Sequence, residues 1–213
     1  EYYYLNNSRL KFVAVSLGNG TTIQGNVVSV ESPGVYTAAY QLQYQVELPY
    51  NITMVYNGTT YHVRSIYLPA GSSVYIPSQN VTLPNGTLIE LLNQTVKIEG
   101  NNISLLKKIY YYVEFVYDTY ISQLPRSGFY PAGYIISLPK ELSNSTTIIV
   151  INTSDYHINV SSPMTVRVNV TVYYRVTFVL GKYSVSEFFR KGSVVDLSTN
   201  ITVDKDVVFV VKT

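Results

Sequence analysis

The sequence is poor in several residue types. It contains no cysteine and no tryptophan, only 2 methionines, and charged residues make up 13% of its 213 positions, against roughly 25% in a typical soluble domain. Secreted proteins of this size often rely on disulfides, so stability here must come from β packing, glycans or partner subunits. No run of about 18 apolar residues occurs, which excludes a membrane-spanning helix.

Residues that could carry chemistry are also scarce. His62 and His157 have no cysteine or second histidine at ligand spacing, which makes a zinc site improbable. No nucleophile elbow, phosphate loop or dinucleotide-binding motif is found, and the carboxylates are scattered. The net charge is only +2, and the Lys and Arg residues form no basic cluster of the kind that binds nucleic acid. We therefore expect no enzymatic activity, no catalytic residue, no metal and no cofactor other than covalent glycans.

Asparagine, in contrast, is abundant in one context. Of 16 asparagines, 13 begin an Asn-x-Ser/Thr tripeptide, where the frequency of Ser and Thr would place about three by chance. This tripeptide is the acceptor for N-linked glycans on accessible segments of exported chains. The pattern predicts a heavily glycosylated extracellular protein, exported with its signal peptide already removed. The predicted attachment sites are Asn6, Asn19, Asn51, Asn57, Asn80, Asn85, Asn93, Asn102, Asn144, Asn152, Asn159, Asn169 and Asn200.

Strand signals dominate the rest of the chain. Apolar residues alternate with polar ones in 40–48 and again in 166–178, a period of two that is typical of half-buried strands. Asn57-Gly58 between two such runs is a strong hairpin signal. The sequence predicts an all-β, immunoglobulin-like sandwich over residues 21–213, preceded by a separate N-terminal element over residues 1–20.

An internal repeat of about 60 residues runs through the predicted sandwich. Three segments carry a short apolar run that leads into a turn and is followed 14 to 18 residues later by a glycine: Gly71, Gly133 and Gly192. The third and fifth residues after each glycine are aliphatic. The pattern predicts a recurring hairpin, glycine turn and returning strand, although convergent turn chemistry could imitate it.

The N-terminal element contains a run that is apolar on both faces, followed by the glycine-rich segment 18–20. One interpretation is an ordinary first strand that folds back into its own domain. The other is a donor strand that completes the sheet of a neighbouring subunit, with a hinge at Gly18 and Gly20. In that interpretation the interface residues are Leu10, Phe12, Val13, Ala14, Val15 and Leu17.

These features together resemble surface proteins of thermoacidophilic archaea, and more narrowly the pilins of archaeal thread filaments. The resemblance rests on the cysteine-free Tyr/Val/Thr-rich composition, the sequons, the Leu-Pro-Ala-Gly and Tyr-Pro-Ala-Gly turns and the hinged N-terminal strand. It implies a glycosylated cell-surface filament, polymerised head to tail with identical subunits by donor strand complementation, which contacts surfaces or neighbouring cells. Two alternatives remain: a monomeric adhesion module associated with a surface layer, and a secreted acid hydrolase.

Overall fold

A computed structural model describes residues 2–23, 25, 27–31, 33–180, 182–194, 200–204 and 207–210. Every regular element in this part of the chain is a strand. The fold class is an all-β, immunoglobulin-like sandwich, which confirms the prediction. Among the described residues there is no helix that could cross a membrane.

The chain divides into two compact units, unit 1 over residues 1–110 and unit 2 over residues 111–213. Strand β10 (Lys107–Tyr117) begins in the first and continues into the second. The other strands of unit 1 are β1 (Tyr2–Leu5), β2 (Ser8–Leu17), β3 (Thr22–Ile23), β4 (Tyr36–Tyr56), β5 (Thr59–Pro69), β6 (Ser73–Ile76), β7 (Gln79–Thr82), β8 (Thr87–Leu91) and β9 (Gln94–Lys97). Seven of them form a sheet in the order β1-β2-β4-β6-β9, with β3 on β2 and β5 on β4.

Strand β4 organises unit 1 because its two halves have different partners. Its first half pairs with β2, from Tyr36 opposite Leu17 to Tyr44 opposite Ser8. The register with β5 shifts between Glu47 and Ile52, where a proline at position 49 cannot donate a ladder hydrogen bond. Beyond this irregularity the strand continues into the predicted hairpin, whose turn residues Asn57 and Gly58 have positive φ angles of 46° and 75°.

Unit 2 contains β11 (Gly128–Pro131), β12 (Ile135–Ser137), β13 (Glu141–Ser143), β14 (Thr147–Asn152), β15 (His157–Asn159), β16 (Met164–Leu180), β17 (Tyr183–Arg190), β18 (Asn200–Asp204) and β19 (Val207–Val210). Its main sheet has the order β13-β14-β16-β10, with β17 on β16 and β11 on β10. The predicted alternation in 166–178 holds best at Val168, Val170 and Val172, which are all buried.

Each unit has its own hydrophobic core. In unit 1 the fully buried side chains include Ile52, Met54 and Leu68, and in unit 2 they include Val113 and Ile151. Each core therefore draws on a long strand: Ile52 and Met54 belong to β4, and Val113 belongs to β10. At the edge of the second core, burial raises the pKa of Tyr117 to about 12, and its hydroxyl donates to the carbonyl of Pro125 at 2.7 Å.

The glycine turns that suggested a repeat have matching geometry in the two units. Gly71 and Gly133 have φ angles of 78° and 79°, a backbone conformation that side chains with a Cβ adopt only at a cost. The N–H of Gly71 donates to the carbonyl of Ile98, and that of Gly133 donates to the carbonyl of Val160, both at 2.8 Å. The third glycine, Gly192, has a φ of 82°, but the aliphatic positions after it, Val195 and Leu197, lie outside the described residues.

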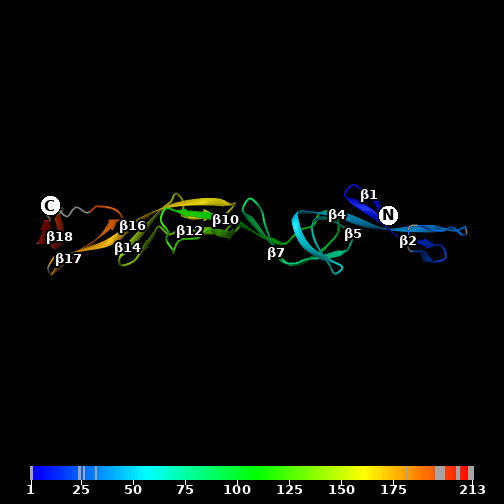
Figure 1. The fold of residues 1–213 in the computed structure, drawn as a ribbon, viewed down its shortest axis with the longest axis horizontal. Coiled ribbons are helices and arrows are strands. Elements are labelled where there is room, and N and C mark those ends of the chain that lie inside the picture. The colour runs from blue at the N-terminus through cyan, green and yellow to red at the C-terminus, as the bar shows by residue number, and fades with distance from the viewer. Residues whose placement is uncertain are drawn as a thin grey trace. The chain divides into compact units, whose positions relative to one another are not determined.

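The donor-strand prediction is wrong. Strand β2, which contains the predicted donor residues, pairs with β4 of the same chain along nearly its whole length and with β1 and β3 on its other edge (Figure 1). Both hydrogen-bonding edges of β2 are thus occupied within unit 1. The register with β4 shifts between Phe12 and Ala14, so the strand carries an extra residue there. Val13 is 52% exposed at this extra residue, whereas Ala14 and Val15 are buried, so one exposed position interrupts the apolar run.

The predicted hinge is a hydrogen-bonded turn. The N–H of Leu17 donates to the carbonyl of Thr21 at 2.8 Å, and the N–H of Gly20 donates to the carbonyl of Leu17 at 2.9 Å. Gly18 also donates to the carbonyl of Val35 at 3.0 Å. These bonds return the chain from β2 to β3 and do not release it toward a neighbouring subunit.

Candidate functional site

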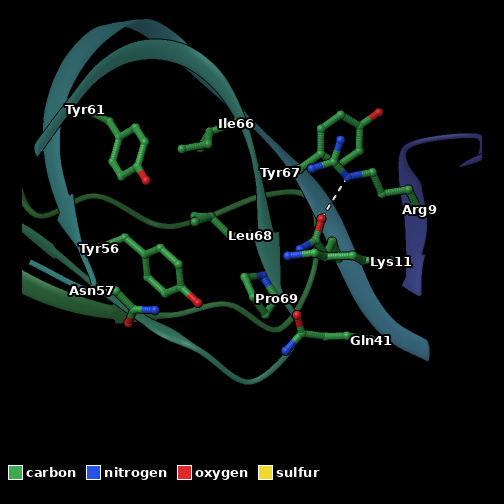
Figure 2. Close-up of a pocket in the computed structure, with 11 residues that line it drawn as sticks. Arg9, Lys11, Gln41, Tyr56, Asn57, Tyr61, Ile66, Tyr67, Leu68 and Pro69 are labelled. Atoms are coloured by element: carbon green, nitrogen blue, oxygen red, sulfur yellow. Dashed lines mark hydrogen bonds between the residues drawn. The ribbon is translucent and has the colours of Figure 1, made fainter. Parts of the chain in front are cut away.

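A pocket of ≈ 470 Å³ lies in unit 1 where β2, β4 and β5 meet. It combines cationic, aromatic and amide side chains and is drawn in Figure 2. The lining residues are Arg9, Lys11, Gln41, Gln43, Tyr56, Asn57, Tyr61, Ile66, Tyr67, Leu68 and Pro69. We call this site the Arg9 pocket.

Strand register brings the first part of the lining together. Arg9 lies opposite Gln43, and Lys11 lies opposite Gln41, in the β2–β4 ladder. Because residues two apart on a strand share a face, both cations project from the same side of β2. Gln43 in turn lies opposite Pro69 of β5, so one row of residues crosses three strands.

Arg9 is held by three contacts. Its guanidinium carbon lies 3.9 Å from the ring centroid of Tyr2 and 4.1 Å from that of Tyr67. Its Nε–H donates to Oε1 of Gln43 at 2.7 Å, and Gln43 is only 6% exposed. Cation–π contacts of this kind each contribute about 0.5–2 kcal/mol, so the guanidinium is fixed in place before any ligand arrives.

The hairpin at the end of β4 supplies the opposite side of the pocket. Tyr56 and Asn57 lie at its tip, and Tyr61 follows at the start of β5. In Figure 2 these aromatic residues face Arg9 and Lys11 across the pocket. The register shift between Glu47 and Ile52 lies between this hairpin and the part of β4 that pairs with β2.

This site was not predicted from the sequence, in which the Lys and Arg residues are scattered. A usable signal was present: Arg9 and Lys11 alternate along one strand, and Gln41 and Gln43 alternate along another. The period of two places each pair on one face, but the register that sets the pairs side by side is not encoded by any local motif.

The predicted glycosylation sites are on the surface wherever their side chains are described. All twelve such asparagines are exposed, including Asn169, which lies between the buried Val168 and Val170. The side chain of Asn200 lies outside the described part of the chain. The structure brings two of the sites to cavities: Asn57 lines the Arg9 pocket, and Asn19 lines a cavity of ≈ 260 Å³ with Gly18. Attachment of glycans stays a prediction.

The possible metal ligands are dispersed. His62, in unit 1, has its Nδ1 3.2 Å from the hydroxyl of Thr53, and His157, in unit 2, has its Nδ1 3.2 Å from the hydroxyl of Ser137. Met54 is fully buried in the core of unit 1. Within the described ranges no three His, Asp or Glu residues form a group that could hold a metal ion.

Comparison with protein families gives one informative result. The family model of the sulfocyanin (SoxE) domain matches residues 41–178. Comparison with curated proteins and with solved structures gives no match.

The family match corrects several predictions. The resemblance to proteins of thermoacidophilic archaea is supported at the coarser level, because sulfocyanins are cupredoxin-like β-sandwiches from such organisms; the assignment to thread pilins has no such support. Sulfocyanins are blue copper proteins, so the match points to electron transfer, and the predicted filament subunit polymerised by donor strand complementation is wrong. The prediction that the protein has no cofactor is wrong at the level of the family, because sulfocyanins are copper proteins.

The residues of this chain do not fit a blue copper centre. Such centres use two histidines and a cysteine thiolate, often with a weak axial methionine. The chain has no cysteine, its two histidines belong to different units, and Met54 is enclosed by apolar side chains. The match nevertheless extends over more than half of the chain, which therefore belongs to the sulfocyanin (SoxE) domain family.

Proposed function

We propose that this protein is a ligand-binding member of the sulfocyanin domain family that works outside the cell and carries no electron through a blue copper centre. One observation carries the proposal: the segment that matches the family contains no cysteine. Thiolate coordination gives the blue site its affinity for copper and its redox character. A β-sandwich without it retains the framework of the family but offers no thiolate ligand.

Binding is the function that the remaining geometry supports. The Arg9 pocket has a volume within the range of about 300–1,000 Å³ that small-molecule sites occupy. Its guanidinium is fixed by two rings and a buried amide, which lowers the entropy lost when a ligand binds. The described residues that line the pocket include no histidine, aspartate or glutamate, and we propose that the pocket binds its ligand without transforming it.

Copper titration tests the proposal. Addition of Cu(II) to the purified chain is expected to produce no intense thiolate-to-copper charge-transfer band in the visible spectrum, because no sulfur anion is available as the donor. A cysteine-containing blue copper protein, treated in the same buffer, provides the positive control. Appearance of a stoichiometric blue species would overturn the proposal.

The extracellular location makes a separate prediction. Because all twelve sequon asparagines with described side chains are exposed, most of the thirteen sites are expected to carry glycans in the native protein. Mass spectrometry of native material before and after enzymatic release of N-glycans measures the occupancy. Fewer than about four occupied sites would contradict this location.

A further inference from the structure

We infer that the Arg9 pocket binds an acidic saccharide. The inference rests on the proposed binding function and specifies the chemical class of the ligand. Three features of the pocket carry it: an uncompensated pair of cations, a lining of tyrosine rings and amides, and an asparagine at its edge that is itself a glycan acceptor.

The cations define the charge of the ligand. Arg9 and Lys11 both line the pocket, and no aspartate or glutamate does. Arg9 commits its Nε–H to Gln43, and within the described part of the chain neither Nη atom of Arg9 nor the ammonium of Lys11 has a hydrogen-bond partner. A guanidinium with a free edge matches the two oxygens of a carboxylate or sulfate. The ammonium group of Lys11 is a second cation in the lining and also favours a negatively charged ligand.

The rest of the lining suits a polyhydroxylated ligand. Tyr56 and Tyr61 each combine an apolar ring with a hydroxyl group, and the amide of the exposed Gln41 can both donate and accept hydrogen bonds. A pyranose ring presents hydroxyl groups at its edge and C–H groups on its faces. It can therefore use the rings and the polar groups together, which an inorganic anion cannot do.

Asn57 is a predicted attachment point for a sugar at this pocket. It lines the pocket, is exposed, and begins a sequon. A glycan attached to its side-chain nitrogen would start at the edge of the cavity that contains Arg9 and Lys11. The saccharide can thus come from two sources: the protein's own Asn57 glycan, or a glycan on another molecule.

Calorimetry with defined probes tests the inference. The full chain without glycans is titrated with tetragalacturonate, with the neutral tetrasaccharide maltotetraose, and with sodium sulfate. The acidic tetrasaccharide is expected to bind about tenfold or more tightly than either of the others, because only it satisfies both the cations and the rings. Equal binding of the two tetrasaccharides, sulfate binding as tight as that of the acidic sugar, or no binding of any probe would overturn the inference.

Variants distinguish the pocket from general charge attraction. Lys11→Gln removes an exposed cation that has no hydrogen-bond or ion-pair partner among the described residues, so the fold should be preserved, and affinity for tetragalacturonate should fall about fivefold. Arg64→Gln removes a cation of unit 1 that does not line the pocket and should leave the affinity unchanged. Equal losses in the two variants, or no loss in Lys11→Gln, would overturn the assignment.

A comparison of glycoproteins identifies the source of the saccharide. If the Asn57 glycan occupies the pocket, the glycosylated protein should bind tetragalacturonate about tenfold more weakly than glycosylated Thr59→Ala, which removes the sequon but keeps the pocket residue Asn57. Equal affinities would indicate a saccharide from another molecule, and both results support the ligand class. This test is independent of the proposed function: a blue copper spectrum would overturn that function, whereas failure of sugar binding without a blue spectrum would overturn only the present inference.

Discussion

Replacing Ile52 by alanine is expected to lower the free energy of unfolding of unit 1 by about 3 kcal/mol. Ile52 is 0% exposed and lies where β4 resumes pairing with β5 after its irregularity, opposite Val63. The truncation removes buried methyl and methylene groups and leaves a cavity among side chains that include Met54 and Leu68. Because these neighbours are anchored in paired strands, they can close the cavity only in part.

Urea unfolding, followed by tyrosine fluorescence, measures this change. Val27→Ala is the control, because Val27 is 82% exposed and its truncation should change stability by no more than about 0.5 kcal/mol. Ile52→Val should fall between the two, at about 1 kcal/mol. A loss below about 1 kcal/mol for Ile52→Ala would show that unit 1 is not packed as described.

Replacing Arg9 by methionine is expected to cost about 2 kcal/mol of stability and to remove the affinity of the pocket for anions. The substitution keeps most of the apolar volume but removes the contacts to the rings of Tyr2 and Tyr67. It also leaves the buried side-chain oxygen of Gln43 without its donor, and an unpaired buried acceptor carries a desolvation penalty. Both effects arise from one side chain because Arg9 is structural and ligand-facing at once.

Thermal unfolding and calorimetry of the same variants separate the two effects. Arg9→Lys keeps the charge but cannot stack as a plane or reproduce the fork of donors, so it should recover little stability and only part of the anion affinity. Arg64→Met, at an exposed position outside the pocket, should be nearly neutral. If Arg9→Met were as stable as the native protein, the contacts of Arg9 with the two rings and with Gln43 would make no measurable contribution to the free energy of unfolding.

Local patterns predicted much of the fold. The alternation around Val168 and Val170 correctly identified a half-buried strand, and Asn57-Gly58 correctly identified a hairpin turn with positive φ angles. Both features depend only on residues close in sequence. The all-β class follows from the same kind of signal, since strands and turns recur along the chain.

The N-terminal strand shows where local patterns failed. Consecutive apolar residues in β2 were interpreted as a strand buried on both faces by a neighbouring subunit, but the strand pairs with β4 and has a register shift at the exposed Val13. A bulge is fixed by the partner strand and cannot be read from β2 alone. The same limit applies to the Arg9 pocket, where the register of β2 with β4 sets Arg9 opposite Gln43 and that of β4 with β5 sets Gln43 opposite Pro69.

The family assignment could not be reached from motifs. The ligands that would identify a blue copper protein are absent, since the chain has no cysteine, and exposed sequons indicate a location without indicating an activity. The family model nevertheless matches residues 41–178. The resemblance to a pilin relied on composition, which proteins from similar environments share.

The absence of a blue copper centre is tested most directly by electron paramagnetic resonance and metal analysis of the protein isolated from its native source. We propose this absence because the sulfocyanin-family chain contains no cysteine. We predict less than stoichiometric copper and no signal with the narrow hyperfine splitting that a copper–thiolate bond produces. One copper per chain with that signal would contradict the account.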